Sequence, residues 1–158
     1  MPREYPWKRN YDTREERDRV RSLPRVMKAK ERRFGGGDLF WTEHITPRDA
    51  QLNPVTSLVS WIEYFAPGAK SLKHGHQNEA IFYILEGRGY EIHNGKRYKW
   101  KKGDVVIVPG GSVHQHFNAD SKKRAVALVI NPKPLYFFLN LIYQRHLEHG
   151  SSVHEYGT

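Results

Sequence analysis

The sequence contains no cysteine, which excludes disulfide bonds and thiolate metal ligands. Any bound metal must therefore be held by histidine and carboxylate side chains. No apolar run is long enough to span a bilayer, and the N-terminal residues lack the apolar segment of a signal peptide. These absences favour a cytoplasmic protein that has no membrane partner. The length of 158 residues fits one domain with a hydrophobic core.

Positive charge is concentrated near the N-terminus. The net charge is +9, and residues 1–33 contain twelve Lys and Arg against six Asp and Glu, so that +6 of it lies there. A basic arm of this kind can contact nucleic acid. Acidic residues are interspersed in it, however, and the sequence has no nucleic-acid-binding motif. We therefore expect a solvated arm that packs on the domain or on a partner subunit, and no nucleic-acid partner.

The two ends of the chain have polar or helical patterns. Residues 12–22 predict a short helix, with Thr13 and Glu16 spaced as a capping box, within a basic arm over 1–37. Gly35, Gly36 and Gly37 indicate a flexible joint at the end of that arm. After residue 131 the apolar spacing predicts an amphipathic helix over 132–150, followed by a flexible tail over 151–158. The apolar faces of both ends favour a homodimer.

The region between these ends reads as short strands separated by turns. Asn94 and Gly95 form a strong signal for a two-residue hairpin. The pattern predicts one all-β domain over 38–131, folded as a small antiparallel sandwich or barrel. The strands expected from β-branched and aromatic runs are 38–44, 56–65, 80–85, 90–93, 96–100, 105–108, 113–118 and 124–130.

Two histidine pairs about forty residues apart carry most of the functional signal. The first is His74-Gly-His76, and the second is His114-Gln-His116. Because side chains alternate between the faces of a strand, the two histidines of each pair can point the same way. Three imidazoles that converge inside a β-barrel form a site for a divalent transition metal.

The segments that hold these histidines resemble the paired signatures of the cupin superfamily, over residues 56–130. The first signature departs from the family pattern at Ala80, where a cupin usually has a metal-binding glutamate. Glu79 lies one residue earlier and should point to the opposite strand face, unless a loop distortion makes it an additional metal ligand. The positions that fit are Gly68, His74, His76 and Gly87 in the first signature, and Gly103, Pro109, Gly111, His114 and Asn118 in the second.

The departure at Ala80 is similar to the pattern of the gentisate 1,2-dioxygenase-type enzymes, of which this chain resembles one half. The resemblance implies a jelly-roll barrel in which His74, His76 and His114 hold Fe(II). It also implies that His116 acts as a catalytic acid/base or as a substrate ligand. Imidazole sites also accept Ni, Zn, Mn and Cu, so the metal found in purified protein need not be the working one.

The residues expected around the metal suggest the kind of substrate. The family enzymes place a carboxylate-binding arginine where this chain has Phe82, and an apolar ring cannot neutralise a carboxylate. We therefore expect a substrate without that carboxylate. Phe82 and Ile84 are predicted to form an apolar floor beside Trp61. Glu63 is interpreted either as a base in the pocket or as the partner of a lysine at the barrel rim.

The remaining histidines have no supporting spacing and are interpreted as ordinary surface or core residues. They are His44, His93, His146, His149 and His154. Asn118 is expected to fix a turn.

Taken together, the resemblance implies a metal-dependent dioxygenase that uses O₂ to cleave a C–C bond of a small phenolic or enolisable substrate. Two alternatives stay open at this point. One is a metal-dependent isomerase, decarboxylase or lyase, and the other is a non-catalytic small-molecule-binding cupin.

Overall fold

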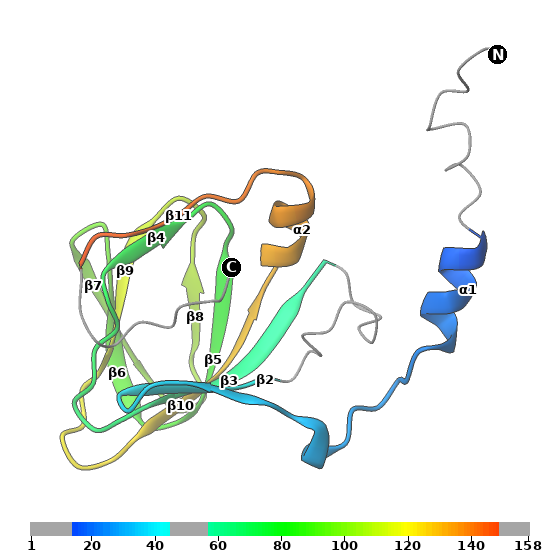
Figure 1. Cartoon of the computed structure of the whole chain (residues 1–158). Coiled ribbons are helices and arrows are strands. Elements are labelled where there is room, and N and C mark those ends of the chain that lie inside the picture. The colour runs from blue at the N-terminus through cyan, green and yellow to red at the C-terminus, as the bar shows by residue number, and fades with distance from the viewer. Residues whose placement is uncertain (1–13, 45–56, 149–158) are drawn as a thin grey trace.

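Two antiparallel sheets packed face to face make up most of the molecule, as a computed structural model shows (Figure 1). The structure describes residues 14–44 and 57–148. One sheet has the strand order β1-β2-β3-β10-β5-β8, and the other has the order β11-β4-β9-β6-β7. The helical elements are α1 (Arg14–Ser22), η2 (Ala29–Glu31) and α2 (Lys133–Phe138). The strands are β1 (Phe34–Gly36), β2 (Phe40–His44), β3 (Val59–Phe65), β4 (His74–His76), β5 (Ala80–Glu86), β6 (Arg88–His93), β7 (Lys96–Lys101), β8 (Val105–Val108), β9 (Val113–Asn118), β10 (Ala125–Asn131) and β11 (Gln144–His146).

Alternating side chains bury one face of each sheet. In β5, Ala80, Phe82 and Ile84 are buried, while Ile81 and Tyr83 between them are exposed. This period of two is what a strand with one solvated face requires. The all-β antiparallel prediction is confirmed. Other core side chains contributed by the two sheets are Phe65, Trp100, Val108 and Val129.

The predicted hairpin is present between β6 and β7. Its turn residues, Asn94 and Gly95, have φ angles of 49° and 84°. Both positive angles belong to the left-handed region, which asparagine and glycine adopt at the least cost. The hairpin sets the register in which Glu91 of β6 faces Tyr98 of β7. On its other side β6 pairs with β9, where Glu91 faces His116.

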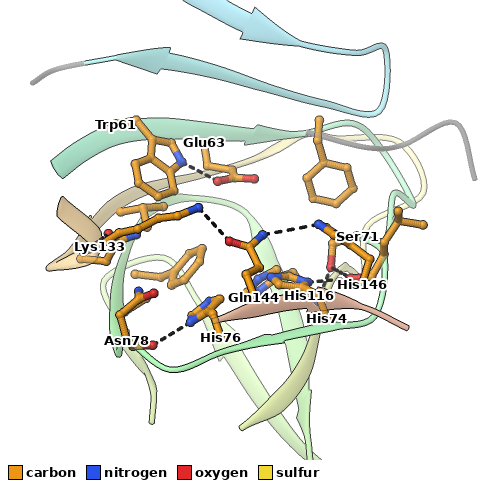
Figure 2. Close-up of a pocket in the computed structure, with 16 residues that line it drawn as sticks. Trp61, Glu63, Ser71, His74, His76, Asn78, His116, Lys133, Gln144 and His146 are labelled. Carbon is orange, nitrogen blue, oxygen red and sulfur yellow. Dashed lines mark hydrogen bonds between the residues drawn. The ribbon is translucent and has the colours of Figure 1, made fainter. Parts of the chain in front are cut away.

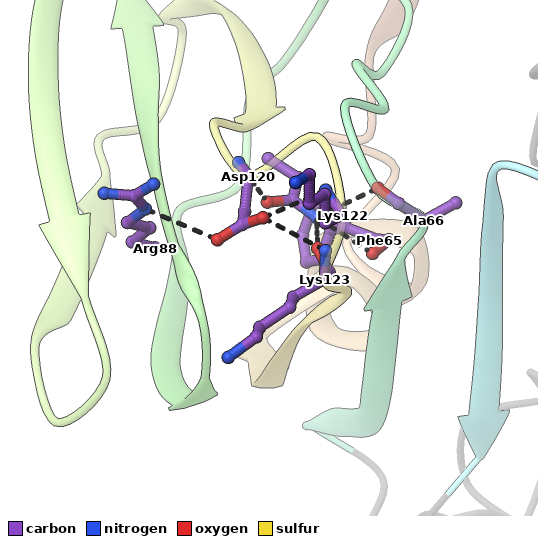
Figure 3. Close-up of polar contacts among 7 residues, drawn as sticks. Phe65, Ala66, Arg88, Asp120, Lys122 and Lys123 are labelled. Carbon is purple, nitrogen blue, oxygen red and sulfur yellow. Dashed lines mark hydrogen bonds and ion pairs between the residues drawn. The ribbon is translucent and has the colours of Figure 1, made fainter.

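Asn118 fastens the loop that joins β9 to β10. Its side-chain amide donates to the carbonyl oxygens of Ala66 at 2.9 Å and Lys123 at 2.8 Å, and its Oδ1 accepts from the N–H of Asp120. The Asp120 carboxylate lies against Arg88 and accepts the backbone N–H groups of the loop (Figure 3). These N–H groups lower the pKa of Asp120. The turn-fixing role expected for Asn118 is confirmed.

The N-terminal part of the chain is more ordered than predicted around the three glycines. Residues 34–36 form β1, which pairs with β2, so the expected flexible joint is wrong there. The predicted helix is present as α1, while Thr13 of its capping box lies outside the described residues. Arg32 forms an ion pair with Glu43, which also accepts the hydroxyl of Tyr64. These contacts fix the segment before β1 against the outer face of the sheet.

The C-terminal part departs most from prediction. The helix expected over 132–150 ends at Phe138, because Asn140 adopts a left-handed φ of 57° and the chain then straightens into β11. β11 pairs with the edge of β4, so backbone hydrogen bonds to an open sheet edge replace the last helical turns. Several apolar side chains of the predicted helix face stay exposed, with Phe138 at 84%. Neither α1 nor α2 has the length and hydropathy needed to cross a bilayer.

Candidate metal centre

Three histidines from two neighbouring strands meet between the sheets. His74 and His76 lie on β4, and His74 faces His114 of β9 directly in the strand register. The ring centroids of His74 and His114 are 4.3 Å apart, and those of His76 and His114 are 4.8 Å apart. One nitrogen from each ring lies within 4.8 Å of the others, so the three imidazoles can share one ion.

Each of the three rings is fixed in the same way. The Nδ1 atoms of His74, His76 and His114 lie 2.8, 2.6 and 2.9 Å from the backbone carbonyl oxygens of Leu72, Asn78 and Ser112, respectively. A carbonyl only accepts, so each Nδ1 carries the proton and each Nε2 has its lone pair available. The Nε2 atom of His114 is buried and has no hydrogen-bond partner among the described residues. A donor set of this kind fits a metal ion.

The electrostatic environment keeps these rings neutral. Burial, with a smaller contribution from the charge of His116, lowers the pKa of His74 to about 3. Burial is also the largest cause of the lowered pKa values of His76 and His114. Neutral imidazole is the form that ligates metal, so the site needs no deprotonation step at neutral pH.

His116 differs from the other three histidines in its partner. Its Nδ1 atom lies 2.5 Å from a carboxylate oxygen of Glu91, a residue that faces it from β6. Burial lowers the pKa of His116, but the charge of Glu91, its hydrogen bond to the ring and the charge of Glu63 together raise the pKa above its ordinary value. Trp100 donates its indole N–H to the other carboxylate oxygen at 3.0 Å. Glu91 was not selected from the sequence, because the strand over 90–93 was expected there but its pairing with β9 was not.

A cavity of about 80 Å³ opens beside the histidines (Figure 2). Trp61 and Phe82, which were expected in the pocket, line it, and so does Glu63, for which two interpretations were open. Ile84, which was expected on its floor, lies in the hydrophobic core and does not line it. Glu63 is buried and accepts the indole N–H of Trp61 at 2.6 Å.

Glu79 lies away from the three histidines. Its side chain is exposed, and its carboxylate accepts the hydroxyl of Tyr136 at 3.1 Å. The group of potential ligands contains His74, His76 and His114 and does not include Glu79. Ala80 lines the cavity at the position where the family pattern has a glutamate. Among the described residues, the arrangement is therefore three imidazoles without a carboxylate.

The C-terminal elements add side chains that the sequence analysis did not select. His146 of β11 stacks beside His74, with ring centroids 5.6 Å apart and an interplanar angle of 26°. Gln144 of β11 and Lys133 of α2 also line the cavity (Figure 2). Neither residue belongs to a recognisable motif. Because the sequence predicted a helix here, it gave no reason to place Gln144 and His146 on the same face of a strand.

Comparisons with known proteins agree with this architecture. Residues 61–131 match the family model described as the cupin domain. The 5-aminosalicylate 1,2-dioxygenase of Comamonas sp is 29% identical over 66 residues, which are 42% of this chain and 18% of that protein. Auxin-binding protein 4 of Zea mays is 26% identical over 125 residues, which are 73% of this chain and 60% of that protein.

A solved structure gives the same fold. Salicylate 1,2-dioxygenase from Pseudoaminobacter salicylatoxidans, in adducts with gentisate, aligns with a TM-score of 0.63 and 14% identity, over 92% of this chain and 37% of that one. The chain spans less than two thirds of the length of each of these three relatives. The fold is therefore a cupin jelly roll. Residues 61–131 form a single cupin domain that resembles those of the gentisate and salicylate dioxygenases.

Proposed function

We propose that this chain is a metal-dependent dioxygenase that holds Fe(II) with His74, His76 and His114. Its substrate is a small phenolic or enolisable molecule, in which it cleaves a C–C bond with O₂. The observation that carries the proposal is the set of three neutral imidazoles, each with Nδ1 fixed by a carbonyl and Nε2 available, and with no carboxylate among them. The dioxygenases among the relatives support the reaction class.

The donor set explains why such a substrate suits the site. Three neutral ligands leave both positive charges of a divalent ion uncompensated, so ionised phenolate or enolate oxygens bind favourably beside them. When bound, Fe(II) supplies open coordination positions for the substrate and O₂. The same imidazoles also accept Ni, Zn, Mn or Cu, so the proposal concerns the working metal and not the metal found after purification.

The chain's own residues position the substrate and its protons. Glu91 contacts Nδ1 of His116 and favours its protonated form, so that Nε2 can hold a proton toward the cavity that His116 lines. We propose His116 as the acid/base. Trp61 and Phe82 form apolar walls that orient a small ring or enol and exclude water. Glu63 is a second carboxylate within reach of the same cavity.

Oxygen consumption tests the proposal. Anaerobically prepared protein loaded with Fe(II) is mixed with a panel of catechol, hydroquinone and acetylacetone, and oxygen uptake and product mass are measured. We expect uptake with at least one compound and a loss of at least about 100-fold in His74→Ala. His93→Ala changes a histidine outside the group of potential ligands and should keep the activity. Metal-replete protein that consumes no oxygen would contradict the proposal, and turnover without oxygen would indicate a non-redox isomerase, decarboxylase or lyase.

A non-catalytic binding function is the second candidate. It is favoured by the similarity to auxin-binding protein 4, which extends over 73% of this chain. A binding protein would retain its ligand unchanged. Mass spectrometry of a bound phenol before and after exposure to oxygen separates the two candidates, because the dioxygenase converts the compound and the binding protein releases it intact.

We also propose that the chain forms a homodimer through the outer face of the six-stranded sheet. Ile130, Ile81 and Ile107 stand in one row across β10, β5 and β8, and Tyr83 and Val105 stand in the next row. These five side chains are all exposed and uncharged. Two copies that each carry a net charge of +9 repel each other, and this group of five uncharged side chains offers a patch where they can approach.

A further inference from the structure

The outer face of the five-stranded sheet carries a concentration of positive charge. Residues that stand opposite each other in an antiparallel pair share a face of the sheet. Because Glu91 and Trp100 are buried between the sheets, the residues that alternate with them point outward. On β7 these outward residues are Arg97, Lys99 and Lys101, and all three are exposed. Among the described residues, no carboxylate forms an ion pair with their side chains.

Two stacked aromatic rings stand beside these cations. Tyr90 of β6 lies opposite Lys99 on one side and opposite Phe117 of β9 on the other. The two rings stack with their centroids 4.5 Å apart and an interplanar angle of 12°. Phe117 pairs in turn with Lys70, so one row across the sheet consists of lysine, tyrosine, phenylalanine and lysine. The guanidinium of Arg97 lies over Tyr90, with Cζ 4.1 Å from the ring centroid.

The loop after β9 extends the positive charge at one corner of this face. Arg88 of β6 is exposed and stands opposite Lys101 of β7. Asp120, which pairs with Arg88, also accepts the backbone N–H groups of Lys122 and Lys123 (Figure 3). The side chains of both lysines are exposed. At this corner one carboxylate therefore stands among several cations.

The other acidic side chain near this face lies at its far margin. Glu148 accepts the side-chain amide of Gln115 at 3.1 Å and the backbone N–H of Lys73 at 3.3 Å, on the side toward β4. Lysines on an edge strand such as β7 also discourage pairing with another chain. That role does not account for the stacked rings or for Lys70, which lie away from the edge.

We propose that the outer face of β7, β6 and β9 binds single-stranded nucleic acid (Figure 1). Phosphate groups follow the cations, and bases stack on the rings and on the guanidinium plane. Outward residues of a strand repeat about every 6.6–6.8 Å, which is close to the separation of neighbouring phosphates in an extended single strand. A bilayer surface would require strongly exposed apolar side chains. The most exposed of these, Phe137 and Phe138, belong to α2 and not to this face.

This face is independent of the two sites proposed above. It does not include the three histidines, and the proposed dimer uses the outer face of the other sheet. The expectation that the chain has no nucleic-acid partner rested on the N-terminal arm and on the lack of a known motif. The basic and aromatic face is assembled instead by the register of β6 with β7 and β9.

Fluorescence anisotropy with the full chain tests the proposal. The probes are labelled oligo(dT) and oligo(U) of about 20 nucleotides, longer than such sites usually cover. Lys99→Gln/Lys101→Gln should bind at least one of them about tenfold more weakly at about 0.1 M salt. It should also reduce the slope of log K against log salt concentration by about 1.4, or about 0.7 for each lost phosphate contact.

A matched variant controls for net charge. Lys30→Gln/Arg33→Gln removes the same charge from exposed positions before β1. Because salt screens charges that do not contact the probe, it should change the affinity by less than about twofold. Loss of binding in this variant equal to the loss in Lys99→Gln/Lys101→Gln would assign binding to overall charge and overturn the proposal.

Tyr90→Leu separates base stacking from charge. It should weaken oligonucleotide binding by about fivefold or more, because stacking of one base contributes at least that much. Binding of heparin, a polyanion without bases, should stay unchanged. Circular dichroism checks that the variant folds, and Phe117→Leu, judged by the same criteria, replaces it if it does not.

Three further results would overturn the proposal. The first is a wild type that binds neither oligonucleotide. The second is a Tyr90→Leu variant that binds oligonucleotides like the wild type, or that loses heparin to the same extent. The third is tighter binding of duplex DNA of the same length, or of vesicles of phosphatidylserine and phosphatidylcholine, which would assign this face to another partner.

Discussion

Glu91 of β6 and His116 of β9 lie with Oε2 and Nδ1 only 2.5 Å apart, and both side chains are buried between the sheets. The register of the two strands sets them directly opposite each other. The carboxylate also accepts the indole N–H of Trp100. The buried carboxylate of Glu91 therefore fixes the ring of His116, which lines the cavity, and also binds Trp100, which belongs to the hydrophobic core.

Glu91→Ala should therefore lower the free energy of unfolding by about 2–5 kcal/mol, because it leaves the indole and the imidazole without their buried acceptor. Urea denaturation measures the change. Glu86→Ala is the matched control, since it removes an exposed ion pair with Arg124, and it should cost no more than about 1 kcal/mol. Equal effects of the two substitutions would contradict a structural role for the buried contact.

Asn118→Ala should destabilise the protein by about 2–4 kcal/mol. The substitution removes the amide that donates to the carbonyls of Ala66 and Lys123 and the oxygen that accepts from Asp120. Lys122→Ala changes an exposed side chain in the same loop and should have an effect of less than about 0.5 kcal/mol. Thermal unfolding of the two variants compares them, and an Asn118→Ala variant as stable as Lys122→Ala would exclude the loop as a source of stability.

Ile107→Lys should weaken the proposed dimer by about 30-fold or more, because it places a charge at the β8 end of the apolar row that runs across β10, β5 and β8. Ile107 is 64% exposed in the single chain, and Val26, at 62%, lies in the segment before β1. Val26→Lys therefore serves as the control for an exposed apolar residue. Sedimentation of the wild type as a monomer at all concentrations, or of Ile107→Lys as an intact dimer, would exclude this interface.

The strands and the histidine pairs were predictable because both depend on a local period. Alternation along a strand directs His74 and His76 to one face, and Asn94 with Gly95 marks the hairpin that follows. The same local rule could not find Lys133 and Gln144. Their position depends on the pairing of β11 with the open edge of β4. This contact between distant parts of the sequence forms in place of the helix that the spacing of the C-terminal apolar residues predicts.

Glu63 and Glu91 illustrate a second limit. From the sequence, a carboxylate in a strand is predicted to lie at the surface, because burial of a charge without a partner is costly. Here the partners come from the cavity wall and the core: Trp61 donates to Glu63, and Trp100 and His116 contact Glu91. Such pairs become visible only when the register of neighbouring strands is known.

Anomalous diffraction from anaerobically grown, Fe(II)-loaded crystals tests the central claim most directly. The account predicts one iron peak per chain, with the Nε2 atoms of His74, His76 and His114 each about 2.0–2.3 Å away. Glu79 should stay at the surface against Tyr136, where it lies in this structure. An iron peak away from these rings, or one bound by Glu79 in place of a histidine, would contradict the three-histidine centre.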